Sequence, residues 1–309
     1  MTPASSGPRV DIGDIFFPGE PLETVIHRVA GDGVTIRSTR RIGGGSINET
    51  SHLTLSDGTD LFLKRNSSRH DGLFREEARG LRALRRGGRP RVPEPIAIGE
   101  DGETQFLLLE YIPTGKRGAT FLSELGEELA TLHRTVRCDR CGFDEDNHIG
   151  STPQLNRWDP DWHRFFGEMR LIPQMERARA SGYADAAMER RLHRVVSMLP
   201  ELLPALDPGG ASILHGDLWG GNVIVGPAGE PVLIDPAVYF GHREADLAMT
   251  ELFGGFGSVF LRRYREVWEL EPGYEGRRDL YNLYHLLNHL NLFGTGYLGS
   301  CAAVLRRYG

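Results

Sequence analysis

The first third of the chain alternates hydrophobic and polar residues with the two-residue period of β-strands. Residues 34–40 alternate in this way before a glycine triplet, and residues 49–55 do so after it. The sequence Ser56-Asp57-Gly58-Thr59 then predicts a hairpin turn into a strand at residues 60–64. A continuous apolar run at residues 105–112 predicts a buried strand. Together these segments predict a small antiparallel sheet.

Helical periodicity dominates the rest of the chain. One helix is predicted inside the β-rich part, at residues 74–86, where apolar residues recur at three- and four-residue intervals. Further helices are predicted at residues 121–135, 192–199, 277–293 and 302–308, with a short strand–loop–strand insert at residues 212–235. We therefore expect an α+β protein of two lobes. The first is a small antiparallel sheet with one helix over residues 1–112, and the second is larger and mainly helical, over residues 113–309.

The composition is that of an ordinary globular protein. Of the 309 residues, 39% are hydrophobic and 25% charged, which is enough apolar side chain to exclude a disordered protein. The formal net charge of −6 does not favour a nucleic-acid partner. No apolar run approaches the roughly 18 residues of a membrane span, and no secretory signal is readable. Three cysteines are too few for a disulfide scaffold, so a cytoplasmic protein is expected.

The most specific motif lies inside the β-rich insert. It is the sequence His215-Gly216-Asp217-Leu218-Trp219-Gly220-Gly221-Asn222, followed by a strand that leads to Asp235. Kinase catalytic loops have the same spacing between an aspartate and an asparagine. In phosphoryl transfer, one carboxylate accepts or orients the proton of the acceptor hydroxyl. An amide oxygen and a second carboxylate hold Mg²⁺ on the phosphates of ATP. We therefore interpret Asp217 as the base, and Asn222 and Asp235 as metal ligands.

A simpler interpretation of the motif is that it forms a turn. Asp, Asn and Gly are common in loops for reasons of backbone conformation, so His215-Gly216-Asp217 alone fits a turn as well as a site. The addition of Asn222 and Asp235 at kinase spacing, on a strand–loop–strand unit, favours the site.

Elements of a nucleotide site precede this motif. The loop Gly43-Gly44-Gly45-Ser46-Ile47-Asn48 lies between two predicted strands, where backbone N–H groups of a flexible hairpin cover phosphates. It matches neither G-x-G-x-x-G nor the Walker motif, so alone it is weak evidence. Lys64 ends an apolar strand, where a buried ammonium needs an anion, although an ordinary lysine at a strand end is the alternative. Glu77 on the next helix is the expected partner, but Glu76 is adjacent and only one of the two can face the sheet. Glu110 and Ile112, which close the last strand, are expected at an adenine-binding hinge.

From about residue 20 to residue 308 the chain resembles the fructosamine (ketosamine) kinase family, within the aminoglycoside-phosphotransferase-like, protein-kinase-like fold. The motifs that carry the resemblance are Gly43-Gly44-Gly45-Ser46-Ile47-Asn48, Phe74-Arg75-Glu76-Glu77-Ala78, Asp146-Asn147-His148-Ile149-Gly150-Ser151-Thr152-Pro153-Gln154, the segment from His215 to Asn222, Ile234-Asp235-Pro236-Ala237 and Glu244-Ala245-Asp246-Leu247-Ala248-Met249. The resemblance implies ATP- and Mg²⁺-dependent phosphorylation of the 3-hydroxyl of a ketoamine such as fructosamine or ribulosamine. The acceptor is either a small molecule or carried by a protein. Asp246 is expected to support the catalytic loop from behind.

The acceptor site is predicted around the aromatic residues. Asn156 and Trp158, with Gln154 and Trp162 nearby, form a polar and aromatic cluster suited to a sugar, and packing of both tryptophans in the core is the equal alternative. Trp219, two residues after Asp217, is a further candidate contact.

Two other functions compete with this interpretation. The first is a kinase of the same fold for an aminoglycoside, choline or a free sugar. The second is a nucleotide-binding protein without transfer activity, which the joint presence of Lys64, Asp217, Asn222 and Asp235 disfavours. The pair Cys138 and Cys141 forms a C-x-x-C sequence, and ordinary thiols are preferred over a redox pair because no second pair completes a metal site.

Overall fold

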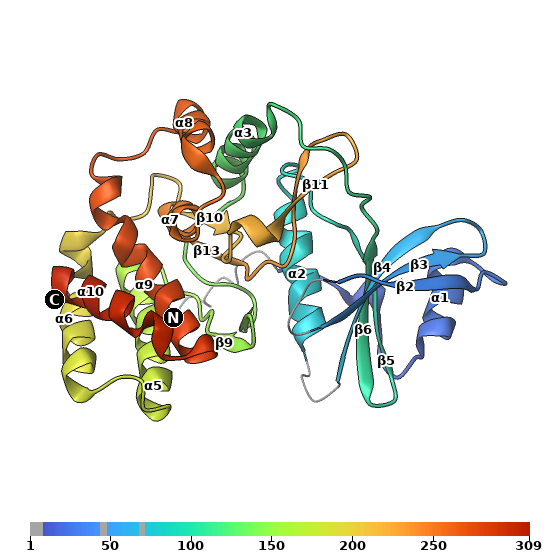
Figure 1. Cartoon of the computed structure of the whole chain (residues 1–309), viewed down its shortest axis with the longest axis horizontal. Helices are drawn as coiled ribbons and strands as arrows, with labels where there is room; N and C mark the ends of the chain where they lie inside the picture. The colour runs from blue at the N-terminus through green and yellow to red at the C-terminus, as the bar shows by residue number, and fades with distance from the viewer. Residues whose placement is uncertain (1–8, 44–47, 68–71) are drawn as a thin grey trace, which may run out of the picture.

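A computed structural model of the chain describes residues 9–43, 48–67 and 72–309. Its first part is built on one sheet, at the right of Figure 1, with six strands in the order β1-β5-β6-β4-β3-β2. The bounds of the strands are β1 Phe16–Phe17, β2 Ile36–Arg41, β3 Glu49–Leu55, β4 Asp60–Ser67, β5 Pro95–Asp101 and β6 Thr104–Glu110. The strands expected at residues 34–40, 49–55, 60–64 and 105–112 therefore all form. We refer to this sheet with its helices as the N-lobe, and to the remainder after Glu110 as the C-lobe.

The N-lobe differs from the prediction in three ways. Strands β1 and β5 form in addition to the four predicted strands. The described residues of the N-lobe form two α-helices, α1 (Leu22–Ala30) and α2 (Leu73–Arg85), where one was expected. Its edge strand β1 pairs in parallel with β5, so the sheet is not wholly antiparallel. The apolar residues of α1 do have helical spacing, but a nine-residue helix is marginal alone and forms because its apolar face packs on the sheet.

Eight α-helices are found in the C-lobe. They are α3 Phe121–Thr135, α4 Trp162–Phe165, α5 Ile172–Ala180, α6 Ala186–Leu202, α7 Glu244–Leu252, α8 Gly257–Val267, α9 Tyr274–Phe293 and α10 Leu298–Tyr308. A π-helical turn, Phe166–Leu171, joins α4 to α5. All four helices expected in this lobe form, and α4, α5, α7 and α8 are additions.

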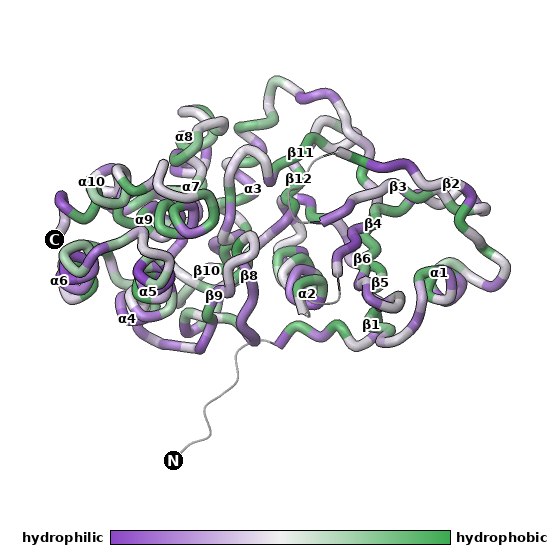
Figure 2. Tube along the Cα trace, turned by 60° about the horizontal axis from the view of Figure 1, so that its bottom comes forward, coloured by the Kyte–Doolittle hydropathy of each residue, from purple (hydrophilic) through white to green (hydrophobic). Residues whose placement is uncertain are grey.

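Three small sheets complete the C-lobe. Strand β10 (Ala211–Leu214) lies between β7 (Arg137–Cys138) and β13 (Tyr239–Gly241), while β11 (Val223–Val225) pairs with β12 (Pro231–Leu233). The expected single strand–loop–strand insert therefore divides between two sheets. The third sheet is the hairpin of β8 (Asn147–Ile149) and β9 (Thr152–Gln154). Strand β10 is buried throughout, and Figure 2 shows it in hydrophobic colours inside the lobe.

The two faces of the N-lobe sheet belong to different cores. Phe106 and Leu108 of β6 face α1 and form a local cluster with Leu53 and Leu63. Leu107 and Leu109 point to the other face, as the two-residue period of a strand requires, and pack with α2. That second core continues from α2 into the C-lobe without a break, which joins the lobes through apolar contacts. α2 accordingly lies between the sheet and the C-lobe in both views (Figures 1 and 2).

Among the residues described, no helix combines the length and the apolar character that a membrane crossing needs.

Close packing of α3 against α8 gives a first test of the fold. A Cβ atom added at Gly126 would lie 2.4 Å from the backbone oxygen of Phe260, so the helices approach closely at this glycine. We expect Gly126→Ala to lower the free energy of unfolding by about 1–3 kcal/mol, because α8 would have to shift. The control is Gly299→Ala in α10, where nothing lies within 4 Å of the added atom. It should be neutral or stabilising by up to about 1 kcal/mol. Equal effects of the two variants in urea unfolding would contradict this packing.

The cysteines give a second test. Cys138, Cys141 and Cys301 are free and buried. Burial raises the pKa of the thiol at Cys138 and at Cys141, and raises that of Cys301 to about 12. Because the thiolate is the reactive form, we expect slow labelling of the native protein by a thiol-specific reagent at pH 8 and three equivalents after unfolding. Rapid labelling of the native protein, or a disulfide between Cys138 and Cys141, would oppose the interpretation of these residues as ordinary thiols.

Candidate active site

The loop that carries Asp217 is fixed from behind by a buried carboxylate. Asp246 of α7 accepts hydrogen bonds from the backbone N–H groups of His215 (2.7 Å) and Gly216 (2.9 Å). His133 of α3 lies 3.2 Å from Asp246 through Nε2. Asp246 is 2% exposed, so it cannot reach a substrate and acts through the loop, as the sequence predicted.

His215 and Gly216 give this loop its shape. Burial lowers the pKa of His215, which is therefore neutral, and its Nε2 donates to the backbone oxygen of Ile234 (3.0 Å). Gly216 has φ = +82°, and an added Cβ would lie 2.0 Å from the backbone oxygen of Ala237. A residue with a side chain would break this contact between the loop and the segment after Asp235. The short sequence His215-Gly216-Asp217 is thus explained by the backbone geometry.

Asn222 brings the two candidate acidic residues to one place. Its Nδ2 donates to the backbone oxygen of Asp217 (2.8 Å), to Oδ2 of Asp217 (3.1 Å) and to the backbone oxygen of Asp235 (3.4 Å). The backbone N–H of Ile234 donates to the backbone oxygen of Asn222 (3.0 Å). Asp235 adopts φ = +53°, the left-handed conformation that is rare for a residue with a side chain and is found at functional sites. The three residues predicted to form the centre of the site are therefore adjacent.

Lys64 connects this group to the N-lobe. Its Nζ lies 2.6 Å from Oε1 of Glu77 on α2 and forms a second ion pair with Asp235 of the C-lobe. Burial alone would lower the pKa of Lys64, but the two carboxylates raise it above its ordinary value, so the ammonium stays charged. Glu77, and not Glu76, faces the sheet, which settles the choice that the sequence left open.

Asp217 has an electrostatic environment suited to proton transfer. Burial raises the pKa of Asp217 to about 7, and the charges of Asp235 and Asp246 act in the same direction, while the hydrogen bond from Asn222 opposes them. A carboxyl group with a pKa near neutrality can both take up and release a proton at physiological pH. This property is expected of a general base and is unusual for an aspartate that only closes a turn.

The oxygen ligands present fit a magnesium ion. Within the described parts of the chain, all hydrogen bonds of the Asn222 side chain use Nδ2, which leaves its Oδ1 available to a cation. The Asp235 side chain is 50% exposed, and the Lys64 ammonium lowers its pKa although burial acts the other way. One carboxylate and one amide oxygen form the kind of partial ligand set with which proteins bind Mg²⁺ on a nucleotide. The described residues hold no cluster of three His, Cys, Asp or Glu side chains that could bind a metal ion by themselves.

Part of the predicted phosphate loop lies outside the described residues. These are Gly44, Gly45, Ser46 and Ile47. Gly43 follows β2, and Asn48 precedes β3 and accepts a hydrogen bond from Asn66 of β4 (2.7 Å). The predicted loop therefore joins two paired strands of the sheet that carries Lys64, although its contact with phosphates stays a prediction.

The predicted hinge is held by an arginine that the sequence analysis did not single out. Arg91 pairs with Glu110 of the N-lobe (2.5 Å) and with Glu230, which precedes β12 in the C-lobe (2.7 Å). The Glu110 carboxylate is thus engaged within the protein, and its backbone N–H donates to the backbone oxygen of Glu94 (2.8 Å). Ile112 is buried, at 7% exposure. No sequence signal marks Arg91, since both partners lie in distant segments.

Trp219 is the candidate acceptor residue with the most exposed side chain. It is 41% exposed and forms an edge-to-face contact with Phe253, which is 42% exposed, at 6.5 Å between ring centroids. Phe253 in turn lies 4.8 Å from the ring of His289 on α9. These rings form an aromatic surface that begins two residues from Asp217. Phe253 was not among the predicted contacts.

The other predicted acceptor residues have internal positions. Asn156 is 1% exposed: its Oδ1 accepts from Arg170 (2.7 Å) and its Nδ2 donates to Asn147 (2.9 Å) and to the backbone of Glu145 (3.1 Å). We therefore correct its assignment from sugar contact to internal support. Trp158 is half-buried, with its ring 6.0 Å from that of Phe240. Its contact with a substrate stays a prediction.

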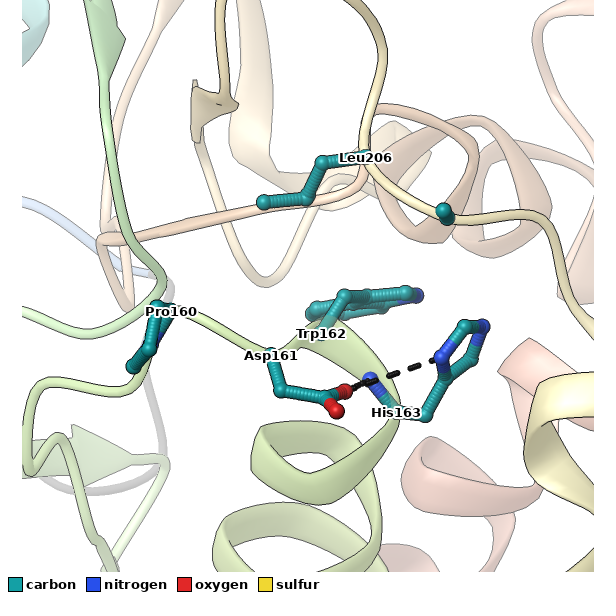
Figure 3. A pocket seen from close by; sticks show the side chains of 6 residues that line it. Pro160, Asp161, Trp162, His163 and Leu206 are labelled. Carbon is teal, nitrogen blue, oxygen red and sulfur yellow. Dashed lines mark hydrogen bonds and ion pairs between the residues drawn. The ribbon is translucent and has the colours of Figure 1, made fainter.

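Trp162 belongs to the core of the C-lobe. It is 2% exposed and packs among rings of α4, the π-helical turn and α9. One edge of it lines a surface hollow with Pro160, Asp161, His163, Ala205 and Leu206 (Figure 3). None of these six residues is a predicted catalytic, nucleotide or metal residue. The alternative of core packing is therefore correct for Trp162.

The fold and the site together define a phosphotransferase with the aminoglycoside-phosphotransferase-like, protein-kinase-like fold. The profile of the fructosamine kinase family matches residues 20–308. The chain belongs to this family.

Individual relatives agree with this assignment. A protein of Synechocystis sp. named probable ketoamine kinase is 39% identical, over 94% of this chain and 96% of its own. The chloroplastic protein-ribulosamine 3-kinase of Arabidopsis thaliana is 40% identical, over 90% of this chain and 84% of its own. A solved structure from Haemophilus somnus, assigned as a fructosamine-3-kinase, superposes with a TM-score of 0.83 at 28% identity and covers 93% of this chain and 96% of its own.

The raised pKa of Asp217 predicts how this residue affects stability. Because its pKa is about 7 in the folded protein and about 4 in an unfolded chain, deprotonation opposes folding. The stability it contributes is fully present below pH 4 and is lost as the pH rises through 7. In metal- and nucleotide-free buffer we expect Asp217→Asn to be more stable than the wild type by roughly 4 kcal/mol at pH 8, with almost no difference at pH 4. Urea unfolding at the two pH values measures this, with the exposed Asp32→Asn as control. A variant that is less stable at pH 8 would contradict the assigned environment.

Proposed function

We propose that this protein phosphorylates a sugar hydroxyl of a ketoamine, of the fructosamine or ribulosamine 3-kinase type, with Mg²⁺-ATP as phosphate donor. The observation that carries the proposal is the contact of Lys64, Glu77 and Asp235 across the two lobes, beside Asn222 and Asp217, in a chain that matches the family over residues 20–308. Relatives named ketoamine kinase and protein-ribulosamine 3-kinase support the class of acceptor.

The roles of the residues follow from their positions. Asp217 accepts the proton of the attacking hydroxyl, and Asn222 holds the Asp217 carboxylate in place through Nδ2. Lys64, held by Glu77, offers its charge to the phosphates. Asn222 Oδ1 and the Asp235 carboxylate would hold Mg²⁺, which neutralises charge that develops on the transferred phosphoryl group. The 43–48 loop would cover the phosphates, and the backbone from Glu110 to Ile112 would meet the adenine. Most of the rate then comes from positioning and electrostatics.

We further propose that Trp219 and Phe253 contact the acceptor. Both rings are more than one-third exposed, and an aromatic face suits the C–H groups of a sugar while leaving its hydroxyls to polar groups. Some kinases of this fold could act on an acceptor that carries several ammonium groups. Such an acceptor would need acidic residues in its binding site instead of aromatic ones.

Three further predictions from the sequence remain predictions. They are the lobe boundary at residue 112, the lack of a nucleic-acid partner and the cytoplasmic location. The name of the Arabidopsis relative carries the word chloroplastic.

The reaction can be tested directly. The protein is mixed with Mg²⁺-ATP and either fructosyl-lysine or ribulosyl-lysine, and ADP release and the phosphorylated product are followed. We expect ketoamine-dependent ADP release that Asp217→Asn lowers by at least about 100-fold, because the variant lacks the base. The nucleotide affinity of Asp217→Asn should stay within a few-fold of the wild type.

Two results would contradict the proposal. ADP release only with an aminoglycoside, choline or a free sugar would keep the fold and overturn the acceptor class. ATP binding without transfer to any of these acceptors would favour a nucleotide-binding protein.

A further inference from the structure

The motif from Asp146 to Gln154 is specific to the family resemblance, but the reaction as described does not use it. In the structure this motif contains the β8–β9 hairpin. The first strand of the hairpin contacts α2. We propose that this hairpin positions α2, and that His148 is a positioning residue for the Lys64–Glu77 pair. This inference rests on the proposed function in one respect, namely that the Lys64–Glu77 pair contacts the nucleotide.

Two adjacent glutamates of α2 point in different directions. Consecutive residues of a helix are about 100° apart around its axis, so Glu76 and Glu77 cannot share a partner. Glu77 faces the sheet and pairs with Lys64. Glu76 faces the C-lobe, where its Oε2 lies 2.7 Å from Nδ1 of His148. The side chains of Glu76 and His148 are 17% and 25% exposed, so their contact is partly shielded from water. α2 is therefore held on one side by Glu77 and on the other by Glu76.

Further contacts lie on the same face of α2 as Glu76. Arg79 pairs with Glu145, just before β8. An added Cβ at Gly80 would lie 3.1 Å from Val238, so the helix approaches the chain closely there. Residues three and four apart share one helix face, which is why these contacts act together with Glu76–His148. Together these contacts fix the rotation of α2 about its axis and its position along that axis relative to the C-lobe.

The hairpin also binds the segment that follows Asp235. Asn147 Nδ2 donates to the backbone oxygen of Val238 (2.8 Å), and Gln154 Nε2 donates to that of Ala237 (3.0 Å). Both side chains are at most 5% exposed, so these bonds are shielded from water. One short hairpin thus contacts the helix that carries Glu77 and the segment that carries Asp235. These are the two partners of Lys64.

The hairpin is itself firmly anchored in the C-lobe. Gln154 Oε1 accepts from Tyr284 of α9 (2.7 Å), and Gln154 Nε2 also donates to Oδ1 of Asn147 (2.7 Å). Asn156, which donates to the same oxygen, is held by Arg170, a cation with no exposed surface that stacks 3.9 Å from the ring centre of Tyr239. A support of this kind can fix the position of α2, which a mobile loop cannot.

The test measures α2 directly. His148→Ala should raise hydrogen exchange of the α2 backbone in the nucleotide-free protein and weaken binding of ATP by about tenfold, because the loss of Glu76–His148 lets Glu77 move from Lys64. His148→Asn, whose side-chain NH₂ takes the place of Nδ1 and can still donate to Glu76, should recover most of the affinity. The matched control is His163→Ala. It removes a histidine that bonds to the backbone of Leu203 (3.0 Å) beside the hollow of Figure 3, and it should change neither quantity.

A double-mutant cycle links the effect to Glu76. The double variant Glu76→Ala/His148→Ala should bind ATP no more weakly than either single variant. The reason is that each single substitution already removes the same Glu76–His148 contact. The proposal is overturned if His148→Ala lowers the melting temperature but leaves α2 exchange and ATP affinity equal to those of His163→Ala. It is also overturned if the two single effects simply add. Exchange and ATP affinity are measured without an acceptor, so a failure of the ketoamine reaction leaves this test intact.

Discussion

The ion pairs of Lys64 are the interaction on which the site depends. One ammonium, 5% exposed, meets Glu77 of α2 and Asp235 of the C-lobe. The Lys64–Glu77 pair is buried, and removal of Lys64 would leave the Glu77 carboxylate without a counter-charge, at a cost of about 3–5 kcal/mol. The sheet, the helix and the C-lobe segment must therefore hold a single relative arrangement. The backbone of the catalytic loop places Asp217 correctly relative to Lys64 only when the lobes have this arrangement.

The elements that contact one another around Lys64 are built for rigidity. Neutral His215, buried Asp246 and Asn222 use most of their hydrogen-bonding groups to hold backbone atoms. Asp217 is the exception, since its raised pKa shows a carboxylate kept in an environment that disfavours its charge. Such groups lower stability and are characteristic of sites where chemistry occurs.

Local features of this fold could be predicted from the sequence, and long-range partners could not. The strand at residues 49–55 and the helix at residues 121–135 were predicted with their observed bounds, because their hydrophobic period is regular. Helix α1 was missed because its nine residues are stable only on the sheet. The centre of the site followed from the spacing of Asp217, Asn222 and Asp235. Asn156 was misinterpreted because its partner, the buried Arg170, lies 14 positions away and is unusual for a core.

The core that passes through α2 has a consequence for how the molecule is built. Apolar side chains of α2 belong to the same cluster as those of α9 and α10, while only the α1 side of the sheet has a cluster of its own. An excised N-lobe would expose the α2 face of its sheet to water, and an excised C-lobe would lose the helix that covers it. The first third of this chain is thus not a portable nucleotide-binding module. A cut between the lobes would therefore pass through a shared apolar core and not through a linker between two finished domains.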